Sequence, residues 1–360
     1  MFVMHKLSNE SPWTAAIATG FSHKREQLAI IVIKAGYAID IETGALIPLK
    51  KKPVIEAEDQ HEGDPLKTAL IVAGESGPPK VGGEFYILGA TLTPPGGDTT
   101  AAEASVALTL GNGKKFNKTI RVVGKRQWQG SWVMPGISQP EPLKPISLGY
   151  ENAYGGNDAE ASPKEKQPTY LANYAGKAYL ADSKRCKDIE LPQLEVPPFI
   201  NSPSDRPQPA GFGPIPIFWS PRRDEFGTVD LEADKRGACP YGHDAKATMH
   251  NAAPLDQRFP NPWQGGEVLT LANLLSGVQY GKSISIKLPG ISPQLIVADK
   301  GQTKTLTSVC DTFWIDAEKN QLFLIYRAAY PMRLAYPDRG WIIVRDAQAA
   351  DKIEQQKEAA

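Results

Sequence analysis

Proline recurs through the middle of the chain more densely than any long helix or central strand allows. Eight prolines fall between positions 192 and 216, and Phe199, Phe212, Phe218 and Trp219 are interleaved with them or follow closely. Proline lacks the amide N–H and its ring obstructs a helix, so this stretch excludes both of those elements. We expect an ordered loop that wraps the protein and is anchored by its aromatic side chains.

Composition extends this expectation to the whole chain. Glycine (32) and proline (31) together make 63 of the 360 residues, whereas average usage of the two is roughly 12%. The apolar fraction of 41% is enough to build a sizeable core and excludes wholesale disorder. The sequence therefore predicts a mainly β protein with long Pro/Gly-rich ordered loops and few short helices, rather than a helical bundle.

The clearest strand pair spans residues 104–123. Apolar and polar residues alternate on both sides of Gly111-Asn112-Gly113. Alternation with a period of two predicts half-buried strands. The Asn-Gly sequence predicts a tight turn with positive φ at both central positions. A β-hairpin is therefore expected here.

Other strands are predicted near both ends of the chain. Residues 28–41 are rich in β-branched side chains and lead through a turn into a second strand at 45–49. Strands are also predicted at 283–288, 294–298, 303–309, 312–316 and 321–327. The block 265–277 fits either a strand or a short helix, and a short helix is predicted within 170–184.

Two segments share one pattern of residues. Tyr37 to Leu46 and Phe313 to Leu322 both read aromatic, any residue, Ile-Asp, any residue, Glu, any three residues, Leu. Either an internal duplication or two hairpins with the same turn chemistry explains this. The fold is then sandwich-like antiparallel sheets, or two related β units. We divide the chain into an N-terminal β unit (1–133), a Pro-rich connecting region (134–265), a C-terminal β unit (266–345) and a polar tail (346–360).

The net charge and the hydropathy of the sequence argue against nucleic acid and membrane as partners. Forty basic and forty acidic side chains cancel, so the basic footprint of a nucleic-acid binder is absent. No run approaches the ~20 apolar residues of a membrane span, and no signal-peptide pattern is evident near the N-terminus. The three cysteines, Cys186, Cys239 and Cys310, favour a reducing compartment. We expect a cytoplasmic protein that binds neither nucleic acid nor membrane.

Few catalytic motifs are present. Gly281-Lys282-Ser283 lacks the earlier glycine and the following helix of a phosphate-binding loop. No Gly-x-Ser-x-Gly or His-Glu-x-x-His motif occurs. Cys239, His243 and His250 offer thiolate and imidazole groups, but their spacing matches no common zinc site. We predict no enzyme, cofactor or metal. The alternative is a β-rich hydrolase or lyase, or a metal-binding protein, that uses this Cys/His region.

Two polar and aromatic clusters, residues 150–158 and 250–258, fall in predicted loops. They either buttress the long loops or form a partner-binding surface. Glu151 could accept backbone N–H groups, and Arg258 is expected to pair with a carboxylate, Glu151 among the candidates. The residues expected to organise the loops or to contact a partner are Tyr150, Glu151, Tyr154, Gly155, Gly156, Asp158, Phe212, Trp219, Asn251, Pro254, Asp256, Gln257 and Arg258.

Several segments match the landmarks of one family, in order along the chain. Residues 122–128 are similar to its Val-x-Gly-Asp-Arg-x-Trp element, with Lys125 in place of Asp. Residues 150–158 resemble its Tyr-Glu-x-Ala-Phe/Tyr-Gly-Gly-x-Asp signature. Residues 209–214 read Pro-Ala-Gly-Phe-Gly-Pro, and residues 251–258 resemble its Asn-x-Ala-Pro-Pro-Asp-Gln-Arg. In this combination the chain resembles a bacterial domain-of-unknown-function family of type VI secretion system effector adaptors, or chaperones.

The resemblance implies a cytoplasmic, non-catalytic protein without a cofactor. Such a protein binds a secreted effector and loads it onto the spike, which is a valine-glycine repeat trimer with a tip protein of proline-alanine-alanine-arginine repeats. Its binding surface would be a sheet edge or the central loops. A structural component of the baseplate is a third interpretation. Residues 173–178 depart from the family's loop, and about 30 residues follow Arg327, where many relatives stop.

Overall fold

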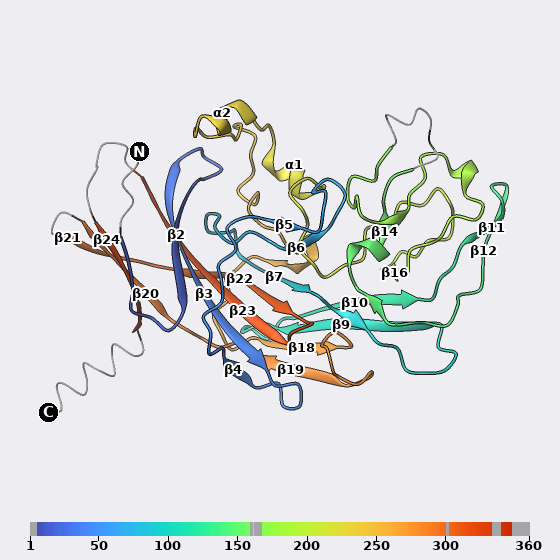
Figure 1. Ribbon diagram of the computed structural model, residues 1–360, viewed down its shortest axis with the longest axis horizontal. Coiled ribbons are helices and arrows are strands. Elements are labelled where there is room, and N and C mark those ends of the chain that lie inside the picture. The colour runs from blue at the N-terminus through green and yellow to red at the C-terminus, as the bar shows by residue number, and fades with distance from the viewer. Residues whose placement is uncertain (1–5, 159–160, 162–167, 300–301, 333–339, 348–360) are drawn as a thin grey trace.

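Three β-sheets contribute to one apolar core, and loops cover the outer face of the largest sheet (Figure 1). The computed structural model describes residues 6–158, 161, 168–299, 302–332 and 340–347. Within these residues the protein is mainly β with short helices, which confirms the predicted fold class.

The largest sheet has seven strands and joins the two ends of the chain. In spatial order its strands are β17 (Arg258–Phe259), β7 (Gly83–Leu88), β22 (Val309–Asp316), β23 (Gln321–Pro331), β3 (Gln27–Ile39) and β2 (Thr14–Phe21), with β4 (Leu46–Pro48) paired to β3. β22 runs parallel to β7 and antiparallel to β23, and β23 runs antiparallel to β3. Strands from the N-terminal and C-terminal parts of the sequence are therefore neighbours.

Two smaller sheets complete the core. One contains β16 (Leu194–Glu195), β10 (Lys115–Val123), β9 (Ala101–Thr109), β18 (Val268–Ala272) and β19 (Ser283–Lys287). The other contains β1 (Lys6–Asn9), β24 (Trp341–Asp346), β20 (Pro293–Asp299) and β21 (Gln302–Leu306). Both sheets place buried apolar side chains in the same cluster as the seven-stranded sheet. The arrangement of the two larger sheets is a sandwich.

Short strand pairs and helices make up the remaining elements. The pairs are β5 (Gln60–His61) with β6 (Leu70–Val72), β8 (Thr91–Leu92) with β13 (Ile146–Ser147), β11 (Trp128–Ser131) with β12 (Met134–Ile137), and β14 (Tyr154–Gly155) with β15 (Lys177–Ala178). The helices are α1 (Arg222–Phe226) and α2 (Leu231–Lys235), with the 3-10 turns η1 (Tyr150–Asn152), η3 (Ser183–Arg185) and η4 (Leu255–Gln257). None of the helices in the described ranges has the length and apolar character needed to cross a bilayer.

Strand β3 belongs to two apolar clusters at once. Ile31, Ile33 and Ala35 join the core between the sheets, whereas Ile30 and Val32 face the covering loops. Successive side chains of a strand point to opposite faces, so a strand that is covered on both faces reads as a continuous apolar run. This explains why residues 28–41, predicted as a strand, read as a nearly continuous apolar run.

The turn between β9 and β10 differs from the expected one. Of residues 111–113, Gly113 alone has positive φ, at 78°. The Gly113 amide donates to the Leu110 carbonyl oxygen (2.8 Å), and the Leu110 amide donates to that of Lys114 (2.8 Å). This is a type I turn followed by a left-handed residue, so the expectation of positive φ at both central positions is wrong.

Two other local expectations are resolved. The ambiguous block 265–277 contains strand β18. The short helix predicted within 170–184 is wrong, because that segment forms β15 and the turn η3 instead. The amides of Lys177 and Tyr179 donate to backbone oxygens of the 150–158 segment, and a helix would withdraw them. Most of the polar tail lies outside the described residues.

The two segments with a shared pattern are both hairpins with an aspartate at the turn. Asp40 Oδ1 accepts the amides of Glu42 (2.9 Å) and Thr43 (3.0 Å). Asp316 Oδ1 accepts the amide of Lys319 (3.0 Å). Both segments therefore share the turn chemistry that was predicted for them, because an aspartate side chain readily bonds the amides that follow it.

Candidate functional site

Tyr150 anchors the first landmark segment against the proline-rich loop. Its hydroxyl donates to the Gly213 carbonyl oxygen (2.9 Å), and its ring packs edge-to-face on Trp219 with centroids 5.6 Å apart. A Cβ added at Gly211 would lie 2.4 Å from the Tyr150 ring. Burial raises the pKa of Tyr150 well above its usual value. The residue therefore holds the loop in place from a buried position.

Gly155 and Gly156 allow two backbone segments to touch. Their φ angles are 153° and 86°, and an added Cβ at either residue would lie 2.3 Å from a backbone oxygen of the facing segment, Asn173 or Gly176. Only glycine adopts this conformation without strain at such a distance. The neighbouring Tyr154 is buried, which raises its pKa to about 12.

Asp158 closes the same segment from inside the protein. Its carboxylate is 2% exposed and accepts two hydrogen bonds from the Arg185 guanidinium, with Oδ1 2.8 Å from Nη1. Oδ2 also accepts the Ala181 amide at 2.8 Å. A buried carboxylate with a bidentate arginine partner organises a loop.

Gln257 connects the second landmark segment to the sheet and to the proline-rich loop. Its Nε2 donates to the carbonyl oxygens of Phe85 (2.9 Å) and Phe212 (3.0 Å), and its Oε1 accepts from Lys118 (2.7 Å). Lys118 also pairs with the exposed Asp256 at 3.0 Å. Phe212 and Gln257 are both fully or nearly fully buried.

Arg258 pairs with a carboxylate as predicted, but the partner is Glu225 and not Glu151. Arg258 Nη1 lies 2.9 Å from both Glu225 oxygens, and the guanidinium also donates to the carbonyl oxygens of Ala253 (2.8 Å) and Asn251 (3.3 Å). Glu151 is exposed at η1, and no described residue donates a hydrogen bond to its carboxylate. The expectation that Glu151 bonds backbone amides is therefore wrong for the described part of the chain.

The remaining landmark residues also make contacts within or between loops. Trp219 is fully buried and stacks on Tyr174, with centroids 6.2 Å apart. Asn251 is 1% exposed and donates to the Val81 carbonyl oxygen at 3.3 Å. Pro254 precedes η4, and its carbonyl oxygen accepts the Gln257 amide at 2.9 Å.

Cys239, His243 and His250 do not contact one another directly in any interaction of the described residues. His243 is exposed, with Nε2 3.2 Å from Arg25 Nη1, and Cys239 Sγ lies 4.0 Å from the Tyr241 carbonyl oxygen. His250 packs edge-to-face on Tyr241, and burial lowers its pKa to about 4. Across the described ranges, no three or more His, Cys, Asp or Glu side chains are grouped so that they could hold a metal ion.

The outer face of the seven-stranded sheet holds charged groups that the sequence did not single out. Lys34 Nζ donates to the Glu75 carboxylate (2.9 Å) and to the Val54 carbonyl oxygen (2.8 Å), and Glu75 also accepts from Trp314 Nε1 (3.0 Å). Lys34 and Glu75 are 2% and 1% exposed. Two more buried ion pairs are Lys80–Glu84 and Arg327–Asp311. All of these pairs lie under the covering loops, so they are structural.

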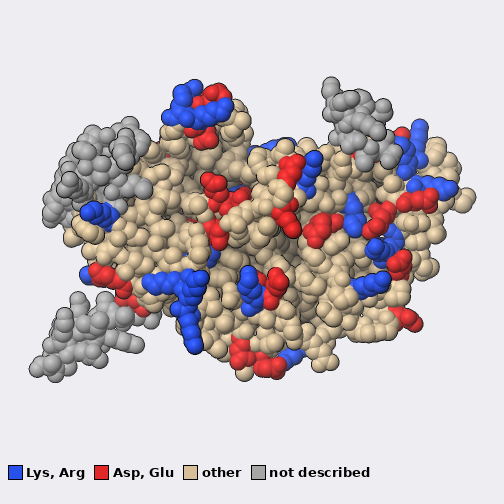
Figure 2. All heavy atoms as spheres, viewed as in Figure 1, with Lys and Arg blue, Asp and Glu red and all other residues tan. Residues whose placement is uncertain are grey.

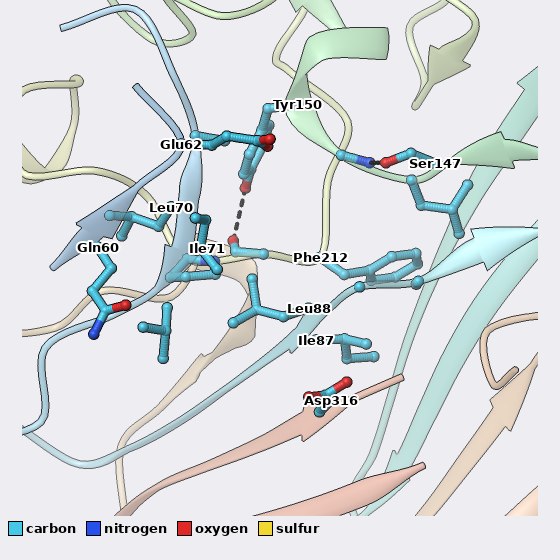
Figure 3. Close-up of a pocket in the computed structure, with 18 of the residues that line it drawn as sticks. Gln60, Glu62, Leu70, Ile71, Ile87, Leu88, Ser147, Tyr150, Phe212 and Asp316 are labelled. Atoms are coloured by element: carbon cyan, nitrogen blue, oxygen red, sulfur yellow. Dashed lines mark hydrogen bonds between the residues drawn. The ribbon is translucent and has the colours of Figure 1, made fainter. Parts of the chain in front are cut away.

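A cleft of about 740 Å³ opens beside these loops (Figure 3). The β5–β6 hairpin, the ends of β7 and β22, and the segment leading into η1 line it. Its buried lining is apolar and includes Leu70, Leu148, Phe212 and Trp314. Five carboxylates and two lysines also line it. This cleft thus combines an apolar floor with an acidic rim.

Sequence reasoning missed this cleft, apart from Tyr150, Glu151 and Phe212. Its charged residues come from segments near 56–67, 151 and 316–319, which only the fold brings together. The acidic stretch at 56–64 follows a lysine triplet and has the pattern of a solvated loop. No local signal distinguishes a solvated loop from the rim of a cleft.

The family comparison agrees with the landmarks. A family model described as an uncharacterized protein conserved in bacteria (DUF2169) matches residues 23–327. The chain belongs to this family. A search of the curated proteins found no match, and neither did a search of the solved structures. The DUF2169 region contains both landmark segments and the whole cleft, whereas β1, β2 and β24 lie outside it.

Proposed function

We propose that the protein is an effector adaptor of a type VI secretion system. It binds a secreted effector in the cytoplasm and loads it onto the spike trimer and its tip protein, without catalysis. The landmark segments that carry the resemblance lie within the DUF2169 match. One structural observation supports a protein-binding role, and it concerns the edge of the largest sheet.

Strand β2 is an unusual edge strand. The six strands at the ends of the three main sheets are β1, β21, β16, β19, β17 and β2. Each of the first five contains a charged residue, whereas β2, the longest at eight residues, contains none. The three-residue β4, which also pairs with β3 alone, has no charge either, but it is too short to dock an extended segment. Charges on an edge normally prevent another chain from pairing with it. Strand β2 therefore has the character of an edge that accepts a partner strand.

The register shows which groups of β2 are available. Residues of an antiparallel pair alternate between those that bond the neighbouring strand and those that direct N–H and C=O away from it. Ser22 bonds Glu26 at the end of the β2–β3 ladder, so the even-numbered residues of β2 bond β3. The N–H and C=O groups of Ala15, Ile17 and Thr19 point to the outer edge, where no described strand pairs with them.

The location of β2 relative to the family match is consistent with a binding element specific to this protein. The strand lies outside residues 23–327, so it is an addition to the matched region. A backbone edge supplies affinity through main-chain hydrogen bonds, and neighbouring side chains supply specificity. We infer that β2 docks an extended segment of the effector.

The test is co-expression of the tagged protein with the effector and spike-tip genes encoded beside its own, followed by sizing of the purified complex. Thr19→Pro removes an outward N–H at an exposed position and leaves the β2–β3 ladder intact. We expect the parent to form a stable complex and Thr19→Pro to retain about tenfold less effector.

Thr19→Ala is the matched control, since it removes the same side chain but keeps the amide. It should bind as the parent does. Absence of any effector complex with the parent would contradict the adaptor role. Permanent incorporation into the assembled machine would favour a baseplate component. Equal binding by Thr19→Pro and Thr19→Ala would show that the effector docks elsewhere.

A further inference from the structure

The cleft beside β6 has a chemically divided lining. Its buried residues are apolar, and Ile71, which also lines it, leaves 54% of its side chain exposed. Figure 3 shows Glu62 and Asp316 on opposite sides of the apolar residues Leu70, Ile71 and Leu88. An exposed apolar surface that is rimmed by charge marks an interaction site.

The acidic side chains at the rim outnumber the basic side chains that pair with them. Asp316 pairs with Lys319 (2.7 Å), and Lys67 pairs with Asp64 outside the lining (3.4 Å). Glu62, Glu151 and Glu318 are exposed, and none of them has an ion pair or hydrogen bond to a described residue. Figure 2 shows acidic side chains gathered on the middle of the face where β5 and β6 lie in Figure 1.

We propose that this cleft binds an extended, basic segment of a partner protein, in which lysine or arginine alternates with apolar residues. The apolar side chains occupy the floor over Leu70 and Ile71, and the basic side chains pair with Glu62 and Glu318 at the rim. The inference deepens the proposed function and rests on it in one respect, that the partner is a protein.

The lining discriminates among other ligands. An acidic rim repels phosphate and nucleic acid, and a free metal ion would make no use of the apolar floor. The volume of about 740 Å³ is within the range of roughly 300–1,000 Å³ that holds a ligand of several residues or of drug size. An extended peptide with both kinds of side chain uses the floor and the rim together.

The experiment measures fluorescence anisotropy of a labelled short peptide that alternates lysine with leucine, titrated with the full chain at low salt. A peptide that alternates glutamate with leucine is the charge-reversed probe. We expect the lysine peptide to bind, the glutamate peptide not to bind, and about 0.3 M salt to weaken binding through screening.

Two sets of variants locate the site. Glu62→Gln with Glu318→Gln should raise the Kd of the lysine peptide about tenfold, and Ile71→Ser should raise it by a similar factor. Glu103→Gln with Glu141→Gln removes the same charge from exposed positions outside the cleft, so its Kd should change less than about twofold.

Three outcomes would overturn the proposal. They are no binding of the lysine peptide to the parent, unchanged binding by the Glu62/Glu318 variant, and an equal loss in the Glu103/Glu141 control. Peptide binding that survives alongside a failed effector co-purification would contradict the proposed function and leave the cleft assignment standing. A stable effector complex without any binding of the lysine peptide would contradict the cleft assignment and leave the proposed function standing.

Discussion

Lys34 illustrates how this fold keeps a charged side chain inside a sheet. The side chain lies in the strand β3, bonds Glu75, and has its ammonium group 5.0 Å from the Trp314 ring and 4.9 Å from the Phe323 ring. A buried ion is tolerated when it is paired and its remaining hydrogen bonds are satisfied. Lys34 meets both conditions because the Val54 carbonyl oxygen accepts another of its protons.

Lys34→Met should lower the free energy of unfolding by about 3 kcal/mol or more, because it leaves the Glu75 carboxylate buried without its cation. Urea denaturation followed by tryptophan fluorescence measures the change. Lys282→Met is the control, since Lys282 and Glu42 form a pair whose side chains are 41% and 76% exposed. That substitution should cost less than about 1 kcal/mol. Equal losses in the two variants would show that burial of the pair is unimportant.

The site residues that could be predicted are those with an unusual local sequence. Tyr150, Gly155 and Gln257 stand in glycine-rich or polar-aromatic stretches that make a loop ordered, and each of them is buried in the fold. Glu62 stands in an ordinary acidic segment, and Glu318 belongs to the pattern shared with residues 37–46, which indicates a hairpin turn and no binding site. Their importance depends on which segments face one another across the cleft, and sequence spacing carries no information about that.

At the scale of the element, the β9–β10 turn gives a direct test of conformation. Gly113 has a φ of 78°, whereas Gly111 lacks positive φ, and an added Cβ at either glycine meets no atom within 4 Å. Gly113→Ala should therefore destabilise the protein by about 1 kcal/mol through backbone strain alone.

Gly111→Ala should be neutral or stabilise by up to about 1 kcal/mol, because it reduces the freedom of the unfolded chain. Thermal melts of the two variants compare the positions under identical conditions. A turn with positive φ at both central positions would instead place both Asn112 and Gly113 in the left-handed region. Equal melting temperatures for the two alanine variants would contradict the type I turn with its left-handed Gly113.

Hairpins were the elements that the sequence predicted best. The strands of β9–β10 and of β22–β23 are adjacent in the chain and have turn residues between them. β9 alternates between buried and more exposed residues, whereas β22 and β23 are continuous runs of mainly apolar, buried residues. β15 was missed because its two residues pair with the distant β14, and the glycines and loop amides of residues 153–156 decide that pairing. A two-residue strand has no periodicity of its own to read.

At the scale of the whole molecule, the sandwich depends on pairings between distant parts of the chain. The parallel pair β7–β22 and the antiparallel pair β9–β18 join strands with long intervening segments. Composition predicts that such sheets exist, because apolar strands must bury a face. It does not predict their order, because every strand of similar pattern is an equally plausible neighbour. The sandwich class was therefore predictable and the strand order was not.

A histidine in the loop that covers the seven-stranded sheet makes the stability of the protein depend on pH. His250 lies in the covering loop, and its pKa is lowered from 6.5 to about 4, first by burial and then by the positive charges of Arg222, Lys80 and Arg327. The folded state therefore keeps this imidazole neutral, whereas the unfolded chain protonates it below pH 6.5. Stability that is fully present above pH 6.5 is lost as the pH falls towards 4, by up to about 3 kcal/mol.

His250→Phe should remove this part of the acid sensitivity, because phenylalanine keeps a ring against Phe226 and Tyr241 but cannot take up a proton. Urea midpoints measured from pH 7 to pH 4 should fall less steeply for this variant than for the parent. His243→Gln, at an exposed position, should follow the parent curve. Parallel curves for the parent and His250→Phe would mean that carboxylates alone cause the acid loss. In that case protonation of the His250 imidazole would not contribute to the pH dependence of the free energy of unfolding.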